Sequence, residues 1–282
     1  MALTQSETCV LVASAVIAAF LIQRRRSDPV VEAAKRGLAQ LCHDAGIDDS
    51  HGIGHALKVL GHLDRALSAA TEAIPSPRAQ ACRLAALLHD ADDKKYFPKT
   101  AKTYANARAI MARAGAPAPV IDDALRQISW VSCSANGNSC PPEAKTNPEL
   151  LWPRWADRLE AVGDIGIVRC YAYNKHEGKT PLACAETPRP QSAEEALALA
   201  TSERFEQYQA SGGGSKSMLD HYYDKLLQVA RPPPSLVRNA YLEAEALAGA
   251  QPLLEVCLAF GRTAEVPVAM IEATAHRLGF AC

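Results

Sequence analysis

The chain has 282 residues and a formal net charge of −1 at pH 7, and 48% of its residues are hydrophobic. This length suffices for one large core or two modest ones, and we expect one. A chain with so little net charge lacks the basic excess needed to bind a nucleic acid polymer, whereas a small phosphorylated ligand needs only a few local cations. Its nine cysteines form no CxxC pair, which indicates reduced core residues in an intracellular compartment.

The N-terminal segment differs in composition from the rest of the chain. Residues 9–22 are almost wholly apolar and are followed by three consecutive arginines. The segment is shorter than the about 20 residues that a membrane-spanning helix needs. A cleaved secretory signal carries its positive charge before the apolar run, not after it. We therefore expect residues 1–26 to be a short membrane anchor or an organellar targeting segment, with the folded domain at residues 27–282 in the cytoplasm or an organelle.

In the first half of the folded domain, apolar residues recur at intervals of three and four, which is the helical period. Gly46 ends the first helix, residues 48–50 form a capping cluster for the next, and Pro75 and Pro77 break the chain before the third. The helices expected here are residues 31–45, 53–67, 82–88, 103–114 and 119–131.

In the second half, residues 133–148 contain Ser, Asn, Gly and Pro and predict a loop. Residues 174–192 are polar and proline-rich, and the glycines of residues 211–215 predict a flexible joint. Extended alternation of β-branched residues is nearly absent along the whole chain, so the expected fold class is all-α. The helices expected here are residues 152–173, 193–210, 217–230 and 236–260, the last as one helix or two with Pro252 as the candidate bend.

The apolar helix at residues 82–88 ends in the adjacent pair His89 and Asp90. Because this run is too apolar to face water, its end places an imidazole and a carboxylate in the interior. A buried carboxylate is costly unless it is paired, protonated or bound to a metal. His55 and Asp157 lie in other helical patterns and are candidate partners. Taken singly, each of these residues also fits a buried hydrogen-bonded pair.

The sequences around these residues resemble a known family. His55 begins His-Ala-Leu-Lys-Val, and Asp157 lies in Ala-Asp-Arg-Leu-Glu-Ala. This H…HD…D order resembles the HD-domain metal-dependent phosphohydrolases. Over residues 31–262, including the segments 93–96 and 221–227, the chain is similar to the single-domain bacterial HD hydrolases that include nucleoside triphosphate pyrophosphohydrolases.

The resemblance implies an HD-type helical bundle with added C-terminal helices. It also implies one divalent metal ion, whose coordinated water would attack phosphorus. Imidazole and carboxylate ligands suit Mn²⁺, the ion we expect, with Mg²⁺, Fe²⁺, Co²⁺ and Zn²⁺ as alternatives. The implied metal ligands are His55, His89, Asp90 and Asp157.

Two residues follow the HD pair as candidates for catalysis. Asp93 is a candidate general base or an acceptor for the metal-bound water. Asp92 is a less favoured candidate for the same role, and it could instead be a solvated turn residue. Lys95 matches the family's lysine and is expected to neutralise phosphate oxygens, with a plain surface lysine as the alternative.

Four further residues are candidates for binding substrate. His51 would donate to a phosphate, although an exposed histidine at a helix start fits equally; a zinc pair of His51 with His55 lacks the glutamate of an HExxH helix. Arg158 would pair with Asp157 or with a phosphate. His221 and Lys225 share one face of a helix and would contact phosphate, with surface decoration as the alternative.

The expected function is hydrolysis of a nucleotide, with a nucleoside triphosphate converted to monophosphate and pyrophosphate. A nucleotide phosphomonoesterase and a non-catalytic, membrane-tethered nucleotide-binding module are the alternatives. Trp155, where the resembling sequences often have an acidic residue, favours the binding module. No histidine lies between His89 and Asp157, which argues against a di-iron oxygenase, and no glycine-rich phosphate loop is present, which argues against a kinase. The sequence does not specify the oligomeric state.

Overall fold

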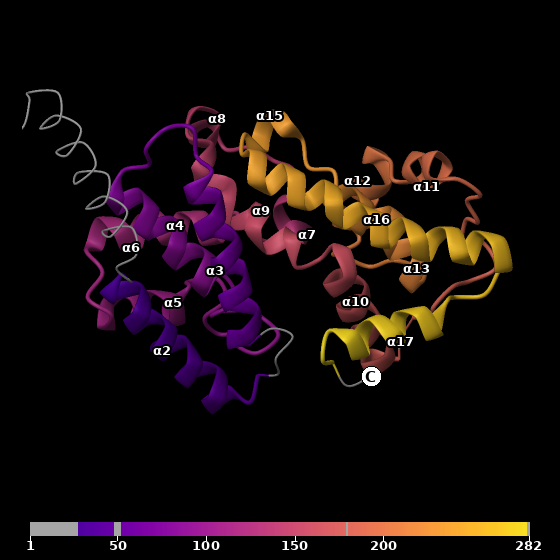
Figure 1. Cartoon of the computed structure of the whole chain (residues 1–282). Helices are drawn as coiled ribbons and strands as arrows, with labels where there is room; N and C mark the ends of the chain where they lie inside the picture. Colours follow the sequence, from indigo (N-terminus) through magenta and orange to yellow (C-terminus); the bar gives the residue numbers. More distant parts are fainter. Residues whose placement is uncertain (1–27, 48–51, 179, 281–282) are drawn as a thin grey trace, which may run out of the picture.

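The computed structural model describes residues 28–47, 52–178 and 180–280 (Figure 1). Within these ranges every regular element is a helix and no strand is present, so the expected all-α fold class is confirmed. None of these helices is long and apolar enough to cross a membrane. The segment at residues 9–22, for which a membrane anchor is expected, lies outside the described ranges.

The helices of the N-terminal half follow the sequence pattern. Asp28 caps the first of them, because its carboxylate accepts hydrogen bonds from Val30 N at 2.9 Å and Val31 N at 3.3 Å. Gly46 ends the same helix with a φ of 63°, a left-handed conformation that favours glycine. The capping cluster expected at residues 48–50 lies outside the described residues. The helices are α2 (Pro29–Ala45), α3 (Ile53–Ser68), α4 (Ser76–Leu88), α5 (Ala105–Arg113) and α6 (Ala118–Ser129).

Residues 133–148 are not the loop that their composition predicts. They contain the short helices α7 (Cys133–Asn136) and α8 (Pro142–Thr146), and η1 (Pro148–Leu151) follows. Ser132 Oγ caps α7 by accepting from Ala135 N, and prolines begin α8 and η1, where a missing N–H costs no hydrogen bond. The serine and prolines that suggest a loop are therefore helix-start signals here.

The single helix expected at residues 152–173 is two helices, α9 (Trp152–Leu159) and α10 (Gly163–Glu177). The turn between them uses Gly163, which has a φ of 66°. α9 packs against α3 and α4 and also against the long helix at Ala240–Thr263, whereas α10 packs mainly against that helix and the last helix of the chain. The turn thus lets the chain pass from one half of the molecule to the other.

The C-terminal half is divided more finely than the sequence predicts. The helix expected at residues 193–210 is broken because Thr201 Oγ1 caps a second helix by accepting from Arg204 N at 3.2 Å. The helix expected at residues 217–230 includes a π-helical turn. The long penultimate helix continues through Pro252, and the last helix was not predicted. The elements are α11 (Ala193–Leu199), α12 (Ser202–Ala210), α13 (Met218–His221), η2 (Tyr222–Leu226), α14 (Leu227–Val229), α15 (Pro234–Val237), α16 (Ala240–Thr263) and α17 (Val268–Arg277).

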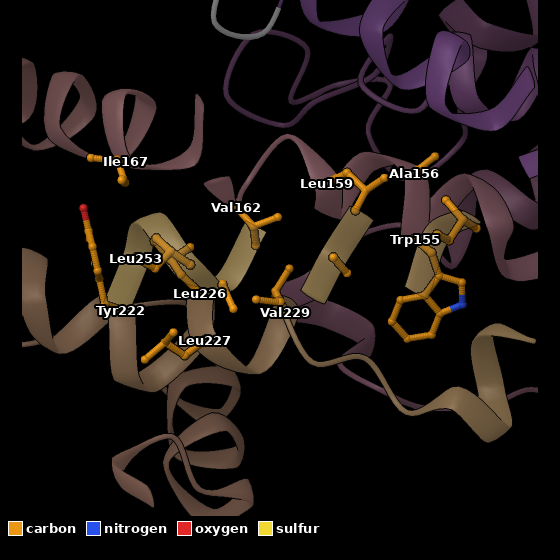
Figure 2. Packing of buried hydrophobic residues seen from close by; sticks show 14 of the residues in the cluster. Trp155, Ala156, Leu159, Val162, Ile167, Tyr222, Leu226, Leu227, Val229 and Leu253 are labelled. Atoms are coloured by element: carbon orange, nitrogen blue, oxygen red, sulfur yellow. The ribbon is translucent and has the colours of Figure 1, made fainter. Parts of the chain in front are cut away.

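Buried apolar side chains form two clusters. The first lies among α2 to α6, and the second joins α9 and α10 to the C-terminal helices and includes Val162, Leu226 and Leu253 (Figure 2). Helix α3 contributes to both, because Leu60 belongs to the first cluster and Leu63 to the second. Figure 1 shows α9 between the two groups of helices. The predicted metal ligands lie at this junction.

Candidate metal centre

Three helices bring the four predicted metal ligands together. His55 lies in the first turn of α3, His89 and Asp90 follow the last residue of α4, and Asp157 lies in α9. These three helices pack against one another. Packing of the two halves therefore positions side chains that are up to about a hundred residues apart in the sequence.

The nearest ligand atoms form an almost regular triangle. His55 Nε2 and His89 Nε2 are 3.3 Å apart, and Asp157 Oδ1 lies 3.3 Å from each of them. Atoms bound to one ion at about 2.1 Å are about 3.0 Å apart at an octahedral angle and about 3.4 Å apart at a tetrahedral one. The triangle thus has the size expected for three ligands of one metal ion.

Asp90 extends this triangle on its more exposed side. Its Oδ2 lies 3.3 Å from His89 Nε2 and 3.8 Å from His55 Nε2. The two imidazoles are 3% and 4% exposed, whereas the side chains of Asp157 and Asp90 are 24% and 31% exposed. The imidazoles therefore form the floor of the site, and the carboxylates form the side that a ligand from solvent would approach.

A hydrogen bond determines which nitrogen of His89 is available. Nδ1 lies 2.9 Å from the carbonyl oxygen of Ala86. A carbonyl only accepts, so Nδ1 carries the proton, and Nε2 of the neutral ring presents a lone pair to the triangle. Asp157 Oδ1, which also only accepts when ionised, faces that lone pair at 3.3 Å. The two atoms repel each other unless a proton or a metal ion lies between them.

The electrostatics of the cluster favour a cation. Burial alone would lower the pKa of His89, but the carboxylates of Asp90 and Asp157 raise it well above its usual range. Burial alone would raise the pKa of both carboxylates, but His89 lowers both, and that of Asp157 lies well below its usual range. The ionised carboxylates hold a proton on the imidazole, and a divalent ion at the same position would displace it.

A buried glutamate behind His55 escaped the sequence analysis. Glu160 is 4% exposed, and its carboxylate lies 3.9 Å from His55 Nδ1, 3.5 Å from His62 Nε2 and 3.9 Å from Lys58 Nζ. Burial raises the pKa of Glu160, but hydrogen bonds from the two histidines lower it to about 2. The available signal was spacing, because Glu160 lies three residues after Asp157 and the helical period places both on one side of α9.

Lys225 and His221 share Tyr208 as a neighbour. Lys225 Nζ lies 5.8 Å from the centre of the Tyr208 ring, and the His221 ring centre is 5.3 Å from it. Burial would lower the pKa of Lys225, but nearby groups that include Tyr208 and Asp157 raise it. The ammonium group is therefore close enough to the candidate metal site for the charge of Asp157 to stabilise it. Burial and the Lys225 charge lower the pKa of His221 to about 3, which keeps its ring neutral.

Arg158 is buried, and its guanidinium contacts the segment between α7 and α8. Nη1 donates to Asn138 Oδ1 at 2.8 Å, and Nη2 donates to Gly137 O. The guanidinium carbon lies 4.6 Å from the centre of the Trp155 ring. These contacts hold the segment against α9.

Asp92 is not the solvated turn residue that the sequence suggested as an alternative. It is 5% exposed, and its carboxylate accepts hydrogen bonds from Asn106 N at 3.0 Å and Ala107 N at 2.9 Å. These bonds satisfy the free amides at the start of α5. Asp92 therefore has a capping role in the fold.

The remaining predicted residues lie around the segment after α4. Asp93 is partly buried, and its Oδ1 accepts from Lys95 N at 2.9 Å. Lys95 is exposed, and its Nζ lies 5.9 Å from the ring centre of Tyr173 on α10. This segment therefore lies beside the C-terminal half. His51 lies outside the described residues.

Comparisons with known proteins give a relative in sequence and solved structures of similar fold. No model of a known protein family matches the chain. A crystal structure of a Lactobacillus plantarum protein superposes with a TM-score of 0.58 at 21% identity, covering 85% of this chain and 99% of that one. The Lin1889 protein of Listeria innocua gives a TM-score of 0.51 at 19% identity, covering 82% and 93%. At these identities the two structures show the all-helical fold alone.

A relative in sequence is the uncharacterized protein L803 of Acanthamoeba polyphaga mimivirus. The two are 38% identical over an alignment of 204 residues, which covers 68% of this chain and 80% of the viral protein. An identity of this size over most of both chains shows common ancestry. The chain therefore belongs to the same family as this viral protein.

Proposed function

We infer that the protein is an HD-type, metal-dependent phosphohydrolase that acts on a nucleotide. The observation that carries this proposal is the convergence of His55, His89, Asp90 and Asp157 from three helices onto one point. Hydrogen bonds are directional and pairwise, so three atoms that are mutually 3.3 Å apart cannot all be paired well. A single cation at the centre would satisfy all three.

The donor set fits a divalent ion such as Mn²⁺, our preferred metal, and also Mg²⁺, Fe²⁺, Co²⁺ or Zn²⁺. Such an ion would supply Lewis acidity, which lowers the pKa of a water molecule and offsets the charge of phosphate oxygens. Asp93, three residues after Asp90 and partly exposed, is the candidate to accept the proton of the attacking water.

The second half of the molecule offers a cation for the remaining phosphates. Lys225 carries a positive charge close enough for Asp157 to raise its pKa. A lysine here suits a substrate with phosphates beyond the one attacked. Lys95, on the segment after α4, is a second candidate cation, and His221, whose ring is neutral, is a candidate hydrogen-bond donor. We therefore propose that a nucleoside triphosphate is cleaved to monophosphate and pyrophosphate, with a nucleotide phosphomonoesterase as the nearest alternative.

The direct test is an assay of the purified full-length chain with Mn²⁺ and a panel of nucleoside mono-, di- and triphosphates. The expected product of a triphosphate is pyrophosphate, and EDTA should abolish its release. Stepwise release of orthophosphate would replace the pyrophosphohydrolase by a phosphomonoesterase. Nucleotide binding without turnover would instead support a non-catalytic binding module, the second candidate. This candidate is favoured by Trp155, an apolar side chain packed beside the buried Arg158.

We further propose that this activity is intracellular, with residues 9–22 attaching the protein to a membrane or residues 1–26 directing it to an organelle. The basis is the apolar composition of that segment and the three arginines after it. Deleting residues 1–26 should then release the protein from membranes without loss of activity. Full-length protein found only in the soluble fraction would remove the anchor.

A further inference from the structure

A row of polar side chains leads from the ligand His55 to helix α16. The Glu160 carboxylate lies 3.9 Å from His55 Nδ1 and 3.5 Å from His62 Nε2. His62 Nδ1 is 2.7 Å from the hydroxyl of Tyr241, and Arg65 Nη1 donates to the same oxygen at 3.1 Å. Tyr241 belongs to α16, so this row connects the C-terminal half to a ligand on α3.

The acceptors in this row determine where its protons lie. An ionised carboxylate only accepts, so the Glu160 carboxylate attracts a proton onto each of the two imidazole nitrogens that face it, His62 Nε2 and His55 Nδ1. In the neutral ring of His62, Nδ1 then has a lone pair, which accepts the hydroxyl proton of Tyr241. In the neutral ring of His55, Nε2 has the lone pair, and this is the atom that belongs to the ligand triangle.

Arg169 favours the other neutral form of His55, in which the proton lies on Nε2. Its Nη1 lies 3.4 Å from His55 Nδ1, and a guanidinium only donates. If Nδ1 accepted that hydrogen bond, the proton of His55 would lie on Nε2, where it would block a metal ion. The same Nη1 also donates to the backbone oxygen of Glu160 at 2.9 Å, and because it carries two hydrogens it can reach both acceptors. Arg169 and the Glu160 carboxylate therefore compete for Nδ1 of His55. Coordination of a metal ion by Nε2 requires the proton on Nδ1, and the carboxylate is the group that attracts a proton there.

We propose that Glu160, held by His62 and Tyr241, is a positioning residue that selects the Nδ1–H form of His55 and keeps Nε2 available for a metal ion. This inference rests on the metal-dependent function proposed above. The corresponding group for His89 is the Ala86 carbonyl, which fixes the same form of that ring. Loss of such a partner typically weakens metal binding about 10- to 100-fold.

The decisive variant is Glu160→Gln. His55 faces Oε2 of Glu160 and His62 faces Oε1, and a glutamine replaces one of these oxygens by an NH2 group, which only donates. In one of the two imidazole rings the proton must then move to the other nitrogen. Long-range proton–nitrogen NMR on the metal-free, full-length chain at alkaline pH reports which ring nitrogen carries the proton, and His55→Gln identifies the His55 signals. We expect Nδ1–H for His55 in the wild type, and a substantial Nε2–H population in Glu160→Gln.

Metal affinity is the second measurement. Titration with Mn²⁺ alone should show a Kd that is about 10- to 100-fold weaker in Glu160→Gln than in the wild type. Tyr241→Phe removes only a hydroxyl and should give a smaller loss in the same direction, which also provides a test if Glu160→Gln fails to fold. Glu149→Gln is the matched control, because Glu149 is also buried but binds Arg78, 2.9 Å away. It should keep the wild-type form of His55 and the wild-type Kd.

The two measurements separate this proposal from the proposed function. An unchanged His55 form and an unchanged Mn²⁺ affinity in both Glu160→Gln and Tyr241→Phe would overturn the positioning role. A wild-type chain that binds no Mn²⁺ would overturn the metal-dependent function, while the NMR comparison would still decide whether Glu160 controls His55. Equal losses of affinity in Glu160→Gln and Glu149→Gln, with no change in the His55 form, would assign Glu160 to stability alone.

Discussion

The two groups of helices differ in what they bury. The N-terminal group, α2 to α6, buries mainly aliphatic side chains such as Leu84 and Leu87, and it carries His55, His89 and Asp90 at its margin. α9 and the C-terminal group bury more polar and charged groups than the N-terminal group, in which the described ones are His55, Asp92 and Gln127. Those of α9 and the C-terminal group are Arg154, Arg158, Glu160, Asn174, Thr187, Ser217, Asp220 and Asn239.

This difference indicates that the two groups contribute different parts of the candidate site. Buried charges cost free energy unless they are paired, so a fold that retains many of them uses them to orient other groups. The N-terminal group positions three of the candidate ligands. The C-terminal group supplies the fourth candidate ligand through α9, the carboxylate behind His55, and Lys225, a cation proposed to contact substrate.

The largest effect should follow from removing the ligand that α9 contributes. Asp157→Ala deletes one corner of the triangle, and loss of a ligand should exceed the about 10- to 100-fold effect of losing an outer partner. We expect hydrolysis to fall more than about 100-fold and bound metal to fall with it, as measured by elemental analysis. Asp64→Ala is the control, because Asp64 pairs with Arg83 at 2.7 Å on the N-terminal group. Full metal content in Asp157→Ala would contradict the assignment.

A smaller effect should separate substrates. Lys225→Ala removes a cation of the C-terminal group that is remote from the attacked phosphate. Turnover of triphosphates should fall by about 100-fold, the loss typical for one charge-stabilising donor, and turnover of monophosphates should fall less. The measurement is kcat/KM for both substrates, with Lys35→Ala on α2 as the control. Equal losses on both substrates would argue against a role with distal phosphates.

The two halves also differ in how well their helices can be predicted from the sequence. In the N-terminal group the apolar period alone decides the helices, and α2, α3, α5 and α6 match their predicted ranges within a few residues. The C-terminal group is shaped by capping side chains and by packing. Thr201 splits one predicted helix, and the π-helical turn at Tyr222–Leu226 leaves no mark in the apolar pattern.

The candidate site shows the same limit. The sequence motifs pointed to the four candidate ligands because each lies in a distinctive local pattern. Glu160 lies in the same Ala-Asp-Arg-Leu-Glu-Ala motif as Asp157, but the motif gives it no role, and only the packing of α3 against α9 reveals that it faces His55 and His62. Asp92 is the reverse case, since a carboxylate in a turn looks solvated until the position of α5 is known.

Stability measurements test whether the two clusters unfold as one. Leu84→Ala in the first cluster and Leu253→Ala in the second should each lower the free energy of unfolding by about 2–5 kcal/mol. Trp152 and Trp155 belong to the second cluster, so tryptophan fluorescence reports on that half. Because α3 spans both clusters, the unfolding midpoints measured by fluorescence and by circular dichroism should shift together in both variants. Separate transitions in Leu84→Ala would show that the halves unfold independently.

The smallest effect concerns acid stability of the C-terminal group. The pKa of His221 is lowered from 6.5 to about 3, so between these values the unfolded chain binds a proton that the folded chain does not. Stability should therefore fall as pH decreases below about 6.5, with a contribution of about 1.4 kcal/mol at about pH 5.5. His221→Phe should flatten this part of the curve in urea unfolding experiments. An equally steep curve in the variant would show that other groups cause the loss.

We propose that the junction of the two halves binds one divalent ion. Crystals of the full-length chain grown with Mn²⁺ and measured at the manganese absorption edge would show whether it does. We expect one anomalous peak at about 2.0–2.3 Å from His55 Nε2, His89 Nε2 and Asp157 Oδ1, with Asp90 as a further ligand. Crystals without a peak at this position, or with manganese bound only elsewhere, would contradict it.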